Sequence, residues 1–158
     1  MNRGASLFLR VVLVLIGVGA AAFLLWEPHL EGRNAHATLF EIYFRDPFLA
    51  FVYAGSIPFF VGLYQGIRVL GRAGQRAEFS PAALRSLRII KVCALLLVGF
   101  IALGEVFLFM GPSDDRAGGV MMGVVLAFLS IVVATAMTIL ERAVQSAVNM
   151  KSEIDLTV

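Results

Sequence analysis

Three polar side chains, Tyr53, Gln65 and Glu105, interrupt apolar runs of the sequence. A carboxyl group inside such a run is expected to be protonated, hydrogen-bonded or wetted by a cavity. Glu105 can therefore carry a proton or bind a ligand, and it can equally be a structural hydrogen-bond partner. Tyr53 and Glu105 each lie six residues from one end of their runs, which is about 9 Å along a helix. If those two ends share one side of a membrane, we predict a hydrogen bond between Tyr53 and Glu105.

Basic residues outside the apolar runs form a second group of candidates. Arg68, Arg72 and Arg76 recur every fourth residue, so they form one stripe if the second apolar helix continues past the membrane. The next run adds three more basic residues: Arg85, Arg88 and Lys91. These side chains can rest on anionic lipid headgroups, or they can bind an acidic surface of a cytoplasmic partner.

The C-terminal segment, "NMKSEIDLTV", is polar and then apolar. Leu156 and Val158 alternate as in an extended peptide, so a partner could add this segment to a sheet edge and bind its carboxylate. The alternative is a frayed terminus.

Motifs for catalysis and metal binding are missing from the sequence. It contains no G-x-S-x-G, no H-E-x-x-H and no glycine-rich phosphate loop followed by lysine, so we expect neither an enzyme nor a cofactor. Cys93 is the single cysteine and lies in an apolar run. His29 and His36 are seven residues apart, without a ligand-like spacing, and we interpret them as solvated loop residues rather than a metal or pH-sensing site.

Membrane-spanning helices must position these side chains. Hydrophobic residues make up 59% of the 158 residues and charged residues only 15%, too few for the surface of a soluble domain. Four apolar segments have the roughly 20 residues that a membrane-crossing helix needs, at about 7–26, 47–70, 87–110 and 118–140. The sequence thus predicts an all-α integral membrane four-helix bundle in a single domain, 1–158, with a long loop at 71–86 and a tail at 141–158.

The first span resembles a signal peptide in having arginines before an apolar core. The apolar run continues past Ala20 to Ala22 through "FLLW", however, and Trp26 suits a membrane interface. We therefore predict an uncleaved anchor.

The basic residues also predict the orientation of the chain. Ten of the thirteen lysine and arginine residues lie near the N-terminus, in the 71–86 region with its flanks, or in the tail. Because cytoplasmic loops are enriched in lysine and arginine, we predict that both termini and the 71–86 loop are cytoplasmic.

Local signals predict helix boundaries and packing faces. Ser80 is a suitable N-cap and Pro81 a suitable first residue for the third helix. Small residues predict two close packing faces. On the fourth span they are Gly119, Gly123, Ala127, Ser130 and Ala134, and on the second they are Ala50, Ala54, Pro58, Gly62 and Gly66. Pro58 leaves the carbonyl of Ala54 without its helical partner, and we predict that Tyr53 or a protonated Glu105 donates to it. Gln65 lies on nearly the same face.

Four motifs together resemble the YoaS-like family of small bacterial membrane proteins. They are "SIPFFVGLYQGIRVL", "FSPAALRSLRIIKVCAL", "SDDRAG" and the closing "NMKSEIDLTV". The resemblance covers nearly the whole chain and implies four spans in the bacterial cytoplasmic membrane. It implies no established activity. Members are often encoded beside a small helix-turn-helix regulator of the Cro/C1 type, which suggests a partner of that class.

Three functions are compatible with these observations. The first is a non-enzymatic regulatory or scaffold protein that binds a cytoplasmic regulator through the Arg68 to Lys91 region and the tail, without direct contact to nucleic acid. The second is a subunit of a small oligomeric transporter or channel, because one copy leaves little room for a pathway. The third is a lipid-binding factor that holds membrane lipids at the basic loop. The small-residue stripe of the fourth span also suits a homo-oligomer.

Overall fold

Four long helices form the protein in a computed structural model that describes residues 3–30, 38, 40, 47–73, 80–110 and 116–156. They are α1 (Arg3–Leu30), α3 (Pro47–Ala73), α4 (Pro81–Met110) and α5 (Arg116–Leu156). Each contains a stretch that is long and apolar enough to cross a membrane. The predicted all-α fold, with four helices long and apolar enough to cross a membrane, is thereby confirmed for these residues.

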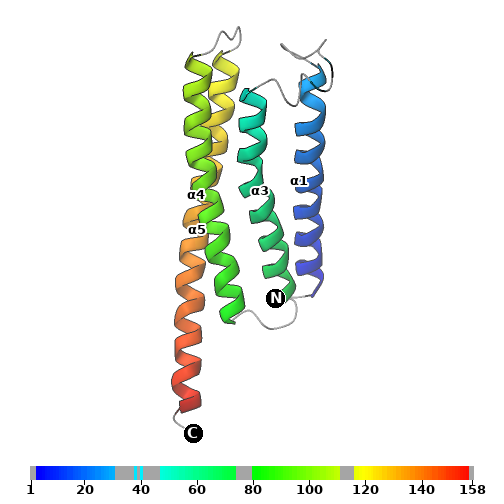
Figure 1. Ribbon diagram of the computed structural model, residues 1–158. Coiled ribbons are helices and arrows are strands. Elements are labelled where there is room, and N and C mark those ends of the chain that lie inside the picture. The colour runs from blue at the N-terminus through cyan, green and yellow to red at the C-terminus, as the bar shows by residue number, and fades with distance from the viewer. Residues whose placement is uncertain are drawn as a thin grey trace.

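The helices lie side by side in chain order (Figure 1). The main packing contacts join α1 to α3, α3 to α4, and α4 to α5. α1 therefore lies at one edge, and the arrangement is more open than a closed four-helix bundle, in which the first and last helices would also pack together. Much of the apolar surface faces outward, as for Phe8 and Met110, which are 68% and 82% exposed. Such a surface is suited to lipid, because soluble proteins rarely expose contiguous apolar patches larger than a few hundred Å².

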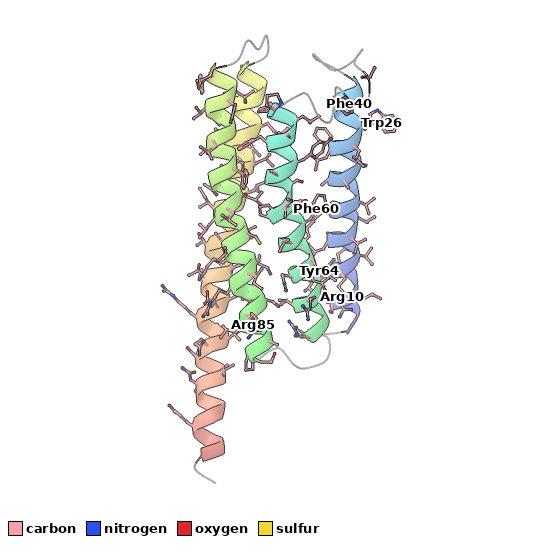
Figure 2. The ribbon with its side chains drawn as sticks, viewed as in Figure 1. Arg10, Trp26, Phe40, Phe60, Tyr64 and Arg85 are labelled. Atoms are coloured by element: carbon pink, nitrogen blue, oxygen red, sulfur yellow. The ribbon has the colours of Figure 1, made fainter. Side chains whose placement is uncertain are left out.

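Both termini lie at the same end of the protein, which we call the terminal end (Figure 1). Trp26 lies at the opposite end of α1 and is 66% exposed (Figure 2), as expected for an interfacial tryptophan. The C-terminal end of α3 and the N-terminal end of α4 also lie at the terminal end (Figure 1). The side of the membrane on which this end lies remains the sequence-based prediction.

Ser80 caps α4 as predicted. The Ser80 Oγ accepts a hydrogen bond from the Ala83 backbone N–H at 3.2 Å, and the Ser80 carbonyl accepts from Ala83 and Leu84. α3 continues to Ala73 and α4 begins at Pro81, so the two helices extend into both ends of the segment 71–86 that was predicted as a loop. Both helices extend past their apolar segments.

Replacing Ser80 with alanine should lower the free energy of unfolding by about 1 kcal/mol, the usual value of a helix N-cap. Ser146→Ala is the matched control, because the Ser146 Oγ donates only back to the Arg142 carbonyl of its own helix at 3.0 Å. Far-UV circular dichroism of the detergent-solubilised protein during titration with SDS measures the free energy of unfolding of both variants. Equal losses in the two variants would contradict the capping role.

The C-terminal segment corrects one prediction. α5 runs to Leu156, so the segment expected to be extended or frayed is helical up to that residue, and Val158 lies outside the described residues. Residues 141–156 favour helix because alanine, glutamate, glutamine and methionine are good helix formers. The alternation of Leu156 and Val158 was too short a pattern to outweigh them. α5 projects beyond the other helices at the terminal end (Figure 1).

The predicted small-residue face of α3 is divided between two neighbours. Ala50 and Ala54 are exposed, whereas Pro58 is buried. A Cβ on Gly62 would lie 3.6 Å from the Cβ of Cys93 on α4, while one on Gly66 would lie 3.1 Å from the Leu13 Cδ1 on α1. The small residues of α3 therefore do not form one packing face, because α3 lies between α1 and α4.

Candidate functional site

Arg72 joins α3 to α4 at the terminal end. Its Nη1 donates to the Ala82 carbonyl at 3.1 Å and to the Ser86 Oγ at 3.0 Å. Ser86 is buried, with 3% of its surface exposed, and its hydroxyl also donates to the Ala82 carbonyl. Arg72, predicted as a partner-binding residue, is thus engaged within the protein. Arg76 lies outside the described residues.

Glu141 joins α5 to α4 at the same end. Its carboxylate oxygens accept hydrogen bonds from Arg88 Nε at 3.0 Å and from Lys91 Nζ. The Glu141 side chain is only 14% exposed and that of Lys91 26%, whereas that of Arg88 is 62% exposed. Arg88 therefore presents much of its surface outward even though one of its nitrogens is paired.

Arg10 and Ser6 join α1 to α3. The Ser6 hydroxyl donates to the Leu70 carbonyl, and Ser6 is buried. The guanidinium of Arg10 lies over Gly71, where a Cβ would be 3.1 Å from Nη2. Figure 2 shows Arg10 at the terminal end of α1. Sequence reasoning used Arg10 only to orient the chain, because nothing in its spacing indicates which helix it contacts.

Exposed cations complete this end of the molecule. Arg85 and Arg142 are exposed. Arg68 is exposed too, and its guanidinium carbon lies 5.7 Å from the centroid of the Tyr64 ring, a distance that allows a cation–π interaction. The structure thus divides the predicted basic region into cations that link helices and cations that face outward.

Tyr53 and Glu105 contact different helices. The Tyr53 hydroxyl donates to the Leu24 carbonyl of α1 at 2.9 Å. Glu105 lies against α5, with its Oε1 at the place where a Cβ of Gly123 would be, and its Oε2 is buried without a hydrogen-bond partner. The predicted Tyr53–Glu105 hydrogen bond is therefore wrong, and so is the prediction that one of them donates to the Ala54 carbonyl.

Gln65 is the third predicted intramembrane polar residue. Its Oε1 is buried and has no hydrogen-bond partner. Gly62 of α3 lies at the level of Cys93 on α4, and the two helices run in opposite directions. Gln65 lies on the terminal side of this level and Glu105 on the other side, so they are separated by about 20 Å along the helix axes. Tyr53, Gln65 and Glu105 do not form one site.

Replacing Tyr53 with phenylalanine should lower the free energy of unfolding by about 1 kcal/mol, because the Leu24 carbonyl loses a donor in an environment with little water. Tyr64→Phe on the same helix is the control, since Tyr64 is 58% exposed. SDS-titrated unfolding compares the two variants. A loss in Tyr64→Phe as large as that in Tyr53→Phe would show that the hydrogen bond to α1 is not the cause.

No three histidine, cysteine, aspartate or glutamate side chains lie close enough to bind a metal within the described part of the chain. The side chains of His29 and His36 lie outside that part. The described part of the terminal end thus carries exposed cations beside the projecting end of α5, and their positive charge is complementary to anionic or acidic groups.

Comparisons with known proteins identify relatives of the chain. The profile of the family DUF2975, described as a protein of unknown function, matches residues 32–158. A protein of Bacillus subtilis (strain 168), named Uncharacterized membrane protein YoaS, is 34% identical over 160 residues, and the alignment covers 100% of both chains. No solved structure matches the chain. Neither description names an activity.

Proposed function

The chain belongs to the DUF2975 family of proteins of unknown function, and from this premise we propose that it is a regulatory or scaffolding membrane protein without enzymatic activity. It spans the bacterial cytoplasmic membrane with both termini in the cytoplasm. There it binds a cytoplasmic partner, and the class that the family resemblance suggests is a small helix-turn-helix transcription regulator of the Cro/C1 type.

The projection of α5 is the observation that supports this proposal most. Arg88 and Lys91 pair with Glu141, and α4 begins at Pro81. Because α4 and α5 run in opposite directions, Pro81 lies at the level of about residue 148 of α5. The last residues of α5 thus extend about 12 Å past the start of α4. A helix that leaves the membrane in this way offers a rigid docking element, which a frayed tail would not.

The outward-facing cations supply charge next to this helix. Arg85, Arg88 and Arg142 are exposed, and Arg72 and Lys91 are used within the protein. An acidic surface of the partner is complementary to them. A helix-turn-helix regulator needs its basic surface for DNA, so such a complex would use another face of the regulator.

The Arg85→Glu/Arg142→Glu double variant should reduce partner capture at least tenfold, because two attractions become repulsions at one surface. The measurement is co-purification of the full-length protein in mild detergent from its native cells, with captured proteins identified by mass spectrometry. Arg116→Glu, at the start of α5 and thus at the opposite end, should capture as much partner as the wild type. Absence of a helix-turn-helix regulator from the wild-type sample would contradict the proposed partner class. Equal capture by the double variant would contradict the proposed surface.

A second candidate is a subunit of an oligomeric transporter or channel. It is favoured by the buried oxygens of Gln65 and Glu105, which have no hydrogen-bond partner, because polar groups of this kind often mark a pathway in membrane proteins. Their separation of about 20 Å along the helices means that one copy does not join them into a site. The regulatory proposal is better supported.

A further inference from the structure

A groove lies between α1 and α3, and its volume is about 290 Å³. This is near the lower limit of about 300 Å³ for small-ligand pockets. Both helices contribute apolar side chains and glycine to its walls, among them Leu13, Gly17, Val18, Phe60, Leu63 and Tyr64. Val18 and Tyr64 are 62% and 58% exposed, so the groove is open to the surroundings of the helices. In a membrane those surroundings are lipid chains.

Hydrogen bonds hold α1 and α3 together beyond both ends of the groove. Ser6 donates to the Leu70 carbonyl at the terminal end, and Tyr53 donates to the Leu24 carbonyl at the other. Between them the helices approach closely at two glycines: a Cβ on Gly17 would lie 3.4 Å from the Leu63 Cδ1, and one on Gly66 would lie 3.1 Å from the Leu13 Cδ1. The groove is therefore bounded at both ends and belongs to the folded arrangement of the two helices.

Two arginines lie at the terminal end of this groove. Arg10 precedes Leu13 and Val14 by three and four residues, which places it on the groove side of α1, one turn closer to the membrane surface. Its Nε is buried and has no hydrogen-bond partner among the described residues. Arg68 lies at the same end, with its guanidinium next to the ring of Tyr64, which lines the groove. Figure 2 shows Arg10 near the terminal end, with Tyr64 and Phe60 successively farther from it.

We propose that this groove binds an anionic phospholipid, with one acyl chain between α1 and α3 and the phosphate at Arg10 and Arg68. A buried N–H without an acceptor is unfavourable, and the planar guanidinium matches the oxygens of a phosphate. Basic pockets between membrane helices on the cytoplasmic side bind lipid headgroups in this way. The site is independent of the proposed partner surface.

A second copy of the chain is a weaker occupant on grounds of charge. An inserted helix would have to bring a carboxylate to Arg10. Among the acidic side chains that the structure describes, Glu141 is already paired with Arg88 and Lys91, and Glu105 lies far from the terminal end of α4. Glu153 lies on the last turns of α5, past the start of α4. The anionic phospholipid supplies both the negative charge and the apolar chain.

The test uses the full-length protein in nanodiscs that contain phosphatidylglycerol with a photoreactive group in its acyl chain. Mass spectrometry of the digested protein locates the labelled peptides. We expect labels on peptides that contain Leu13 to Ala21 and Phe60 to Ile67. Arg10→Gln should reduce this labelling about fivefold, the effect of one basic residue at an anionic surface. Val18→Phe should reduce it by a similar factor, because the larger ring occupies the groove.

Two matched control variants should be labelled to the same extent as the wild type. Lys151→Gln removes one positive charge from α5, which does not line the groove, and Val11→Phe adds the same ring to an exposed site of α1 outside it. If Arg10→Gln fails to fold, Val18→Phe decides the result. The proposal is overturned if either folded groove variant labels like the wild type, or if phosphatidylcholine with the same photoreactive chain labels these peptides equally. It is also overturned if the groove peptides of the wild type stay unlabelled, as they would when a second copy covers the groove.

Discussion

Replacing Gly123 with leucine should lower the free energy of unfolding by about 3 kcal/mol, the upper part of the range for overpacking. A Cβ at this position would lie 1.7 Å from the Oε1 of Glu105, 2.9 Å from its carboxyl carbon and 3.5 Å from the Ile101 Cγ2. The carboxyl group would have to leave the notch over Gly123. Inside a membrane it has no water to move into, so its displacement is costly. SDS-titrated unfolding in detergent measures the loss.

Gly99→Leu is the control for this prediction. Gly99 lies on α4, and a Cβ there would meet nothing within 4 Å, so the change should cost little. A further variant tests the role of Glu105. Glu105→Ala should recover at least about 1 kcal/mol in the Gly123→Leu background, because residues in contact have non-additive effects. Strictly additive losses would contradict the packing of Glu105 against Gly123.

Local sequence signals were sufficient for several elements of the fold. The four spans follow from apolar length, and the start of α4 follows from Ser80 and Pro81. The small-residue stripe of α5 packs on α4. A Cβ on Gly119 would contact Leu108 and one on Gly123 would contact Glu105, and Ala134 of the same stripe is buried. Each of these features depends on residues within one helix, which is why a single sequence reveals them.

The contacts between helices were harder to predict. Counting residues gives the depth of a side chain but not the direction in which it points around the helix axis. Tyr53 turns toward α1 and Glu105 toward α5, so their separation follows from the order of the helices. The same limit applies to Arg72 and to Glu141, whose partners on α4 are 14 and 53 residues away. No periodicity within a helix reports such pairs.

Replacing Glu141 with leucine should lower the free energy of unfolding by about 1 to 2 kcal/mol. The change leaves Lys91, which is 26% exposed, beside Arg88 without the shared carboxylate. Removing one member of a partly buried pair costs more than an exposed pair contributes, because a charge remains without its partner. Since Arg88 is 62% exposed and reaches solvent, the expected loss is smaller than for a fully buried pair.

The Lys91→Met/Glu141→Leu double variant distinguishes this explanation from a general defect of packing. It removes the stranded charge together with its partner, so it should be more stable than Glu141→Leu alone. A double variant that loses as much as or more than the sum of its single changes would contradict the charge argument. Glu141→Leu also raises the net positive charge of the terminal end, so it should strengthen capture of an acidic partner while it weakens the fold. Opposite effects of one substitution on stability and on capture would separate the structural role of Glu141 from the binding role of the arginines around it.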